Sequence, residues 1–339
     1  MQKAKVLCVT HEARMTGAPI AAARSAAVLS KHFHSEIWTF GIQEQNYLNL
    51  LVDLDVELAN PKPLLLHAYD AFICHSAASI SVVGELIKHK KKVIWWIHEG
   101  EHLFDVINCN LLNLCMNKVE CLVFPSSHSA FHTFGHWVWK RYGAGVYVIP
   151  NFIPGERKYR NHELYKRSKL QILFMGGVRY AKGVDLVWRA AALASSRGEP
   201  LEFIIAGKPV DITLPDLPNC RFVGELDAEN VDLLLESSDV LVHPSRLDNQ
   251  PLVVLEAIHA GLPALTTSIP GLVEFLSKEQ LFVHRPIEIF ENPDFFLQEI
   301  KALIAKAHSF NSRSSPSRCF DVDYHESRLK EVVNWALDH

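Results

Sequence analysis

The sequence has no long apolar run and no grouping of cysteines that would hold a metal. None of its apolar stretches approaches the ~20 residues that a membrane-spanning helix needs. The N-terminus runs directly into a short strand-like segment, without the longer apolar core and cleavage site of a secretory signal. The seven cysteines are an odd set without a Cys-x-x-Cys pair, which argues for reduced thiols and against a zinc ribbon. These absences predict a cytoplasmic protein, at most peripheral at the cytoplasmic face of a membrane.

Two further absences narrow the class of ligand. The 34 basic and 38 acidic residues give a net charge of -4, and no run of like charge is long enough for a nucleic-acid-binding tail. No Gly-x-Gly-x-x-Gly follows the first strand-like run, and no acidic residue is suitably placed behind one. We therefore expect no nucleic-acid partner, and the sequence argues against a nicotinamide-dependent dehydrogenase.

What the sequence does contain is a repeated alternation of β-rich runs and helical stretches. Its 339 residues, 48% of them apolar, can bury a large core and divide into two domains. The alternation predicts an α/β protein with two doubly wound parallel sheets covered by helices. The predicted strands are Lys5 to Thr10, Glu36 to Phe40, Ala71 to His75, Val93 to Ile97, Cys121 to Pro125 and Val146 to Ile149, then Leu170 to Met175, Leu201 to Ala206, Cys220 to Val223, Val240 to Pro244 and Pro263 to Thr266.

The segment Pro150-Asn151-Phe152-Ile153-Pro154-Gly155 has the proline and glycine content of a hinge between domains. It predicts a first domain over residues 1–152 and a second over residues 153–323. The last stretch, residues 324–339, is predicted to be an amphipathic helix.

A stretch in the second half places two carboxylates around a predicted helix start. Asp248 precedes Pro251, which we expect in the first turn of a helix from Leu252 to Ala260, and Glu256 follows about a turn and a half later. Gly261 is the expected stop. The first amides of such a helix can donate hydrogen bonds to sugar hydroxyls or phosphate oxygens.

A second motif, Gly176 to Gly183, follows a predicted strand and precedes a helix. Glycines let the backbone approach a ligand closely, and Arg179 and Lys182 supply positive charge. A glycine-rich turn, two cations and a helix N-terminus together favour a diphosphate site. A weaker signal of the same kind is Thr16-Gly17-Ala18-Pro19 after the first strand, which also opens a helix.

The segment from His98 to His102 literally satisfies the zinc-peptidase pattern His-Glu-x-x-His. That chemistry requires both histidines on one continuous helix, with a third ligand elsewhere. Here His98 follows a β-rich run and Gly100 lies inside the motif, so the pattern argues against a metal site.

Taken together, these motifs resemble the signature of retaining glycosyltransferase family 4, the group 1 glycosyl transferases. The family has two Glu residues flanking seven others, whereas here the first acid is Asp248. The resemblance is strongest from Gly176 to Glu274 and implies the GT-B fold, in which two Rossmann-like domains face a central cleft. It also implies that the last helix crosses back to the first domain.

The resemblance further implies a role for each matched residue. Asp248 would contact the donor sugar, and Glu256 the ribose. Arg179 and Lys182 would hold the donor's diphosphate, although Arg179 lies closer to Lys182 than in the commonest version of the pattern. His98 would lie beside the reacting face of the sugar. The remaining predicted donor contacts are Gly17, Gly177, Asn249, Gln250, Pro251 and Leu252.

The leading hypothesis is a retaining, metal-independent glycosyltransferase that needs no cofactor. It would move a sugar from a nucleotide diphosphate donor, UDP- or GDP-linked, to a hydroxyl of a glycan or lipid-linked glycan in surface glycan or polysaccharide synthesis. Family precedent favours attack on the same face that the diphosphate leaves. Two alternatives stay open: a catalytically silent sugar-nucleotide-binding subunit of the same fold, and a zinc hydrolase built on His98 and His102.

The segment from Ser129 to Tyr142 mixes aromatic and basic residues, a composition that suits contact with an anionic membrane surface. Core packing of Phe131, Phe134 and Trp137 is the competing interpretation. Flotation with liposomes would decide between them.

Overall fold

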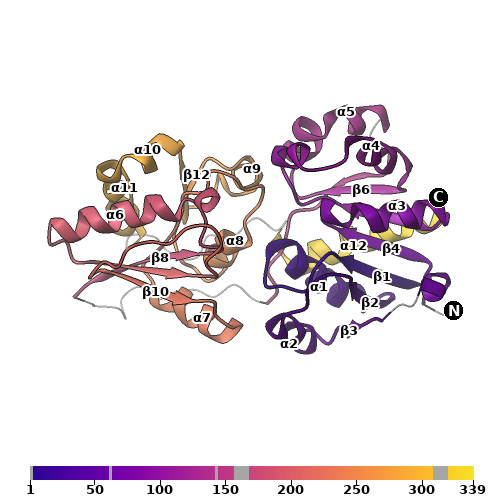
Figure 1. The fold of residues 1–339 in the computed structure, drawn as a ribbon, viewed down its shortest axis with the longest axis horizontal. Coiled ribbons are helices and arrows are strands. Elements are labelled where there is room, and N and C mark those ends of the chain that lie inside the picture. The colour runs from indigo at the N-terminus through magenta and orange to yellow at the C-terminus, as the bar shows by residue number, and fades with distance from the viewer. Residues whose placement is uncertain (1–2, 61–62, 142–143, 156–167, 308–319) are drawn as a thin grey trace. The chain divides into compact units, whose positions relative to one another are not determined.

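The computed structural model describes residues 3–60, 63–141, 144–155, 168–307 and 320–339 (Figure 1). The chain forms two compact units, each built on a parallel sheet. The first unit comprises Met1–Pro154 together with Arg318–His339, and the second Gly155–Ser317. The division at Pro154 lies close to the boundary expected at residue 152.

The described part of the first unit contains a seven-stranded parallel sheet in the order β3-β2-β1-β4-β5-β6-β7. Side chains of β1 alternate between its faces, as the pleat of a strand requires: Val6 and Cys8 belong to one buried cluster, Leu7 and Val9 to another. The strands are β1 (Lys5–Thr10), β2 (His34–Thr39), β3 (Glu57–Leu58), β4 (Ala71–His75), β5 (Lys92–Trp96), β6 (Cys121–Phe124) and β7 (Val146–Val148).

Helices cover both faces of this sheet, which explains why its central strands read as continuous apolar runs. They are α1 (Gly17–Leu29), α2 (Gln45–Asp53), α3 (Ile80–Lys88), α4 (Cys109–Lys118), α5 (Gly135–Val138) and α12 (Val322–Asp338), with short helical turns η1 (Pro63–Ala68), η2 (Ala77–Ser79), η3 (Glu101–Asp105), η4 (Ser129–Thr133) and η5 (Trp139–Arg141).

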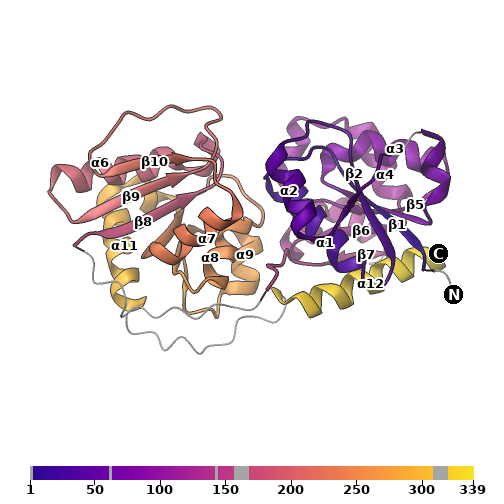
Figure 2. The same ribbon diagram turned by 90° about the horizontal axis from the view of Figure 1, so that it is seen from below.

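The C-terminal helix α12 packs within the first unit, beside α1 and over β5 (Figure 2). Its buried face carries Leu329, Val332 and Val333. These three side chains join the same cluster as Val6 and Cys8 of β1. A segment from the far end of the chain therefore completes the core of the N-terminal sheet.

The second unit repeats the topology with a six-stranded parallel sheet, in the order β10-β9-β8-β11-β12-β13 within the described residues. Its strands are β8 (Leu170–Met175), β9 (Leu201–Ala206), β10 (Cys220–Gly224), β11 (Val240–His243), β12 (Ala264–Thr267) and β13 (Phe282–Arg285). Its helices are η7 (Tyr180–Lys182), α6 (Val184–Ser196), α7 (Ala228–Ser237), α8 (Leu252–His259), α9 (Pro270–Leu276), α10 (Ile287–Glu291) and α11 (Pro293–Ala307).

All eleven predicted strands form, within a few residues of the expected bounds. Two edge strands, β3 and β13, escaped prediction. Strand β3 is only two residues long and exposed, and just one residue of β13, Phe282, is buried. Neither therefore shows the apolar run by which the other strands are recognised.

Candidate active site

Two loops meet where β8 and β11 lie side by side in the second sheet. One leads from β8 to α6 and the other from β11 to α8. In this strand order the two connections diverge, and ligands bind beside the carboxyl ends of the strands at such a point. The motif containing Lys182 and the motif containing Asp248 thus come together although 66 positions separate them.

Backbone contacts lock the two loops to one another. The amide of Arg246 donates to the carbonyl of Ala181 at 2.8 Å. Gly183, the residue before α6, lies so close to Pro244 that a Cβ would sit 2.0 Å from the Pro244 carbonyl oxygen. Gly183 also has a φ of +74°, in the left-handed region that favours glycine. This position therefore requires glycine for both conformation and space.

A side-chain clamp reinforces the same junction. The guanidinium of Arg246 donates to both carboxylate oxygens of Asp185, at 2.7 and 2.8 Å, and to the carbonyl of Tyr180 at 2.7 Å. The same group lies 3.8 Å from the centroid of the Tyr180 ring. The hydrogen bonds to Asp185 are the main reason that the pKa of Arg246 is raised, so this cation is permanent.

At the centre of the junction Asp248 binds two nitrogens. Its Oδ2 atom lies 2.5 Å from Lys182 Nζ and 2.9 Å from His243 Nε2. Burial by itself raises the pKa of Asp248, but the Lys182 charge, and then the hydrogen bond and charge of His243, outweigh it and hold the pKa well below its ordinary value. The carboxylate is therefore ionised at neutral pH and fixes the Lys182 ammonium at the carboxyl edge of the sheet.

The glycine turn before Lys182 has the features of an anion site. Gly176 has a φ of +137°, and a Cβ on Gly177 would have nothing closer than 3.8 Å, so the backbone is open to a ligand. Among the groups that the structure describes, none pairs with the buried Nε of Arg179. The first amides of α6 have no side-chain cap. Guanidinium, ammonium and helix amides can together hold a diphosphate.

The predicted helix after Asp248 forms, with one correction at its start. Pro251 is the N-cap of α8 rather than a residue of its first turn, and it supplies no side-chain cap. Its ψ of 121° is extended, whereas a residue inside the first turn would be helical. The helix ends as expected, because Gly261 has a φ of +75° and its amide donates to Ile258.

The other predicted donor contacts of this loop lie around the same helix. Leu252 is the first residue of α8, and Glu256 lies half-buried one turn further on. The amide of Asn249 donates to Asp248 Oδ1 at 3.1 Å. Gln250 is buried, and its Nε2 donates to the carbonyl of Gly271 at 3.0 Å, which ties the loop to α9.

In the first unit, Gly17 begins α1 after the N-cap Thr16, which makes no side-chain cap. The Thr16 hydroxyl is instead donated to Glu12 Oε1 at 3.2 Å. A Cβ on Gly17 would have no heavy atom within 4 Å. The space beside the Gly17 Cα is therefore open, and the first amides of α1 can donate to a ligand.

His98 lies in the loop after β5, and the structure around it lacks the continuous helix that a zinc-peptidase motif requires. His102 belongs to the separate turn η3, so the two histidines do not share a helix. Glu99 is engaged by the chain itself: its Oε2 accepts from the amides of Ala77 at 2.8 Å and His98 at 3.1 Å. In the parts of the chain that the structure describes, no three His, Cys, Asp or Glu side chains are grouped as metal ligands would be.

In the aromatic and basic segment that begins at Ser129, some side chains are buried and others lie at the surface. Phe134 is fully buried, as the core interpretation predicts, and Trp137 is half-buried with its Nε1 donating to Asn113. Phe131 is 37% exposed and packs on Trp139, which is 65% exposed. Core packing was therefore the wrong interpretation for Phe131, because η4 turns it outward. Tyr142 lies outside the described residues. None of the described helices is long and apolar enough to cross a bilayer.

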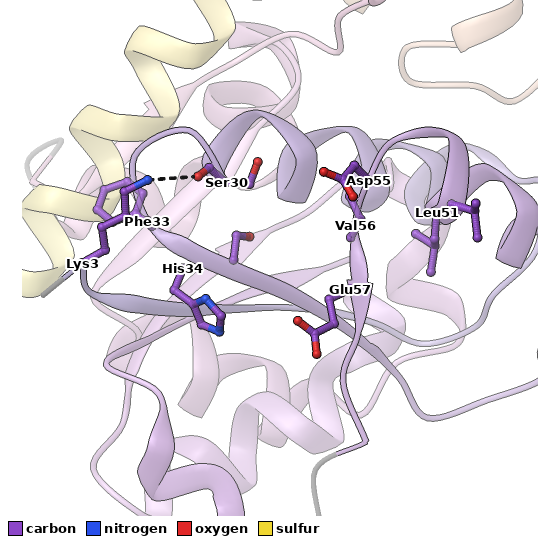
Figure 3. Close-up of a pocket in the computed structure, with 10 residues that line it drawn as sticks. Lys3, Ser30, Phe33, His34, Leu51, Asp55, Val56 and Glu57 are labelled. Carbon is purple, nitrogen blue, oxygen red and sulfur yellow. Dashed lines mark hydrogen bonds between the residues drawn. The ribbon is translucent and has the colours of Figure 1, made fainter.

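A cavity of about 520 Å³ lies in the first unit, at the edge of the sheet where the strands begin (Figure 3). It is lined in part by Phe33, His34 and Asp55. Lys3 at its rim donates to the carbonyls of Ser30 and Lys31, at 3.4 and 3.0 Å, so it caps the C-terminus of α1. The predicted site residues lie outside this cavity.

Comparison with known families agrees with this arrangement. Residues 155–311 match the family model described as glycosyl transferases group 1, and residues 2–150 match that of glycosyl-transferase family 4. Together the two matches take in nearly all of both units. The chain belongs to the group 1, family 4 glycosyltransferases.

Individual relatives of this chain are distant. It is 30% identical over 194 residues to an uncharacterised glycosyltransferase of Methanocaldococcus jannaschii, covering 54% of this chain and 48% of the relative. Its identity to a glycogen synthase of Mycobacterium tuberculosis is 26% over 230 residues, which covers 63% of this chain and 54% of the synthase. The chain thus matches about half the length of these curated relatives.

Similarity of structure is more extensive. HepE of Anabaena, solved in complex with UDP and glucose, superposes with a TM-score of 0.73 at 13% identity, over 98% of this chain and 99% of HepE. With two parallel-sheet α/β units, the chain therefore has the GT-B fold.

Three residues that shape these candidate sites escaped prediction: His243, Arg246 and His75. His243 is the last residue of β11, and His75 is the last residue of β4. A polar residue that closes a buried strand lies at the edge where ligands bind, and this position is the signal that could have found both histidines. Arg246 gave no such signal, because its partner Asp185 lies 61 positions away.

Proposed function

We propose that this glycosyltransferase transfers a sugar, with retention of configuration and without a metal ion, from a nucleotide diphosphate donor to a hydroxyl of a glycan or lipid-linked glycan. The observation that carries the proposal is the junction at the switch point of the second sheet. There Lys182 is fixed 2.5 Å from Asp248, in the turn that also holds Arg179 and opens α6. Two cations and free helix amides surround the position where a leaving diphosphate would lie.

In the proposed mechanism, Arg179, Lys182 and the first amides of α6 stabilise the negative charge that develops on the departing diphosphate. One preorganised donor at such a position is typically worth 10²–10³ in rate. Asp248 orients Lys182 and contacts the donor sugar, and Glu256 binds the ribose. The acceptor hydroxyl attacks on the face that the diphosphate leaves, and the leaving phosphate takes its proton.

Nucleotide binding is the first test. Thermal unfolding would be measured with UDP, GDP, dTDP, CDP and ADP, each with and without EDTA. At ~100 times its dissociation constant, a matching nucleotide stabilises the folded chain by about 2.7 kcal/mol. We expect one nucleotide to stabilise the chain regardless of EDTA and Lys182→Ala to abolish the effect.

The matched control is Lys301→Ala, which removes a half-exposed lysine of the same unit that pairs with Glu199. It should leave the nucleotide effect unchanged. No stabilisation by any of the five nucleotides would contradict the proposal.

Stereochemistry is tested with the donor sugar of the nucleotide that binds. We expect slow donor hydrolysis to release first the anomer present in the donor, as followed by proton NMR. Release of the opposite anomer would exclude retention. Binding without hydrolysis, and without transfer across a panel of acceptors, would favour the silent sugar-nucleotide-binding subunit, the alternative that Asp248 in place of Glu suggests.

A further inference from the structure

A column of flat side chains lies at the carboxyl edge of the first sheet, at the ends of β4 and β5. Nδ1 of His75 lies 3.1 Å from Nε2 of His98, and their ring planes differ by 12°. Trp96 stacks on both rings, with centroids 5.1 Å from His75 and 5.4 Å from His98. Trp96 also stacks on His325 of α12. His75 thus touches His98 directly and is itself fully buried.

Only one proton fits between His75 Nδ1 and His98 Nε2. The burial of His75 decides which ring donates it. If His98 donated, a neutral His75 would hold its own proton on Nε2. No described group reaches His75 Nε2, so that N–H would be buried without an acceptor. Orphaned buried N–H groups are rarer in proteins than acceptors left short of a donor. The hydrogen-bond network therefore assigns the donating proton to His75 Nδ1 and the accepting lone pair to His98 Nε2.

The assignment of this proton requires that both rings are neutral at pH 7, and they are. Burial is the main cause that lowers the pKa of His75 well below its ordinary value. Burial likewise lowers the pKa of His98 to about 4, although the Glu99 carboxylate opposes the shift and His11 reinforces it.

The backbone that carries His98 is held as firmly as the ring. Glu99 joins the loops after β4 and β5, because it accepts from the Ala77 amide and the Ser76 hydroxyl as well as from the His98 amide. Ser76 has a φ of +71°, and its amide and carbonyl bond to the Trp96 carbonyl and the Trp95 indole. The backbone on both sides of the His75–His98 contact is therefore fixed.

We propose that His75 is a positioning residue that fixes His98 in one tautomer, with its proton on Nδ1. His98 then meets the donor sugar as a hydrogen-bond donor and not as a base, since its Nε2 lone pair is already used. The tautomer stands on the geometry of the first unit alone, whereas the part that His98 plays in transfer rests on the proposed function.

The tautomer can be read without any activity. The full chain labelled with ¹⁵N-histidine would be examined at pH 7 by long-range ¹H–¹⁵N correlation, which distinguishes protonated from bare ring nitrogens. His98→Gln and His75→Asn identify the two spin systems among the 18 histidines. We expect His98 to have a protonated Nδ1 and a bare Nε2. A proton on His98 Nε2, or shifts averaged over both tautomers, would overturn the proposal.

Matched variants at His75 test its consequence. His75→Phe keeps a ring against Trp96 but cannot donate, whereas the His75→Asn amide places a donor near the former Nδ1. We expect His75→Phe to average the His98 tautomers and to lower kcat about tenfold, the worth of one hydrogen bond, with the donor KM unchanged. His75→Asn should restore the single His98 tautomer and the kcat of the unsubstituted chain. A single Nδ1–H tautomer and full kcat in His75→Phe would refute the positioning role.

The outcomes of the NMR and variant experiments can be distinguished from a failure of the proposed function. If the chain binds a nucleotide but transfers no sugar, the proposed function fails while the spectra still decide the tautomer. If His75→Phe does not fold, the spectrum of the unsubstituted chain still decides the tautomer, because a proton on His98 Nε2 would exclude donation from His75.

Discussion

At the scale of single residues, the second unit depends on one buried carboxylate held by two partners. The side chain of Asp248 is 12% exposed, and those of Lys182 and His243 are 26% and 2% exposed. Because its pKa is depressed in the folded chain, Asp248 adds stability that is fully present above its unfolded pKa of about 3.9. That contribution is lost only as the pH falls through the lower folded value, so the junction is intact across the physiological range.

Removing this charge should expose its contribution. We expect Asp248→Asn to destabilise the second unit by about 1–3 kcal/mol, since it leaves the partly buried Lys182 ammonium without its counterion, and to weaken nucleotide binding. Asp248→Glu, which supplies the acid that the family has here, should retain both properties. Asp294→Asn breaks an exposed pair with Arg197 and should change stability by less than about 1 kcal/mol. Denaturant titration would check all three, and an equal loss in Asp248→Asn and Asp294→Asn would contradict this account.

At the scale of elements, helix α6 is bounded by two glycines with positive φ that do different work. Gly198 follows the C-cap with a φ of +65° and open space where a Cβ would lie. Gly183 at the N-terminus has a similar φ of +74° but also the close contact with Pro244. Gly198 is therefore required only for its backbone conformation, whereas Gly183 is required for its conformation and for lack of space.

This pair predicts unequal costs. Gly198→Ala should cost about 1 kcal/mol, the strain of a left-handed alanine. Gly183→Ala should cost more, because the new Cβ must push the loop carrying Asp248 away from the loop carrying Lys182, and nucleotide binding should weaken with it. Calorimetry of the full chain would compare them, and similar melting temperatures for the two variants would show that the loops are not tightly apposed.

At the scale of the whole molecule, the first unit is closed by the far end of its own chain. His325 of α12 is buried between Phe152 and Trp96, with ring centroids 4.0 and 5.5 Å away. Burial is the main cause that lowers its pKa to about 3. His75, His98 and His325 are therefore neutral when folded, whereas the unfolded chain protonates them below about pH 6.5.

Acid should consequently weaken the first unit. For a base with a lowered pKa, stability is complete above the unfolded value and falls as the pH drops toward the folded one. Between pH 6.5 and 4, we expect His325 to account for a loss of about 3 kcal/mol. His325→Phe, which keeps the ring contacts, should reduce this slope, and His132→Phe at an exposed histidine should not. Tryptophan fluorescence suits the measurement, because Trp188 is the one tryptophan outside this unit. A pH slope unchanged by His325→Phe would contradict the expectation.

The sequence by itself determined the local features of this protein. Buried parallel strands must be apolar and β-rich, and their ends must turn, so runs such as Lys5–Thr10 and Leu170–Met175 were recognisable with the correct bounds. The same holds for Gly183 and Gly261, because positive φ selects glycine. The family signature rests on such short-range patterns, and so it too was readable from sequence.

Only the tertiary structure decided which of these features touch. The pairing of Lys182 with Asp248 and the contact of His75 with His98 join positions that no local pattern relates. Strand order sets these neighbours, because β8 pairs with β11, and β4 pairs with β5 and with β1. Strand order depends on how a whole unit buries its apolar surface, so no short stretch of sequence specifies which residues become partners.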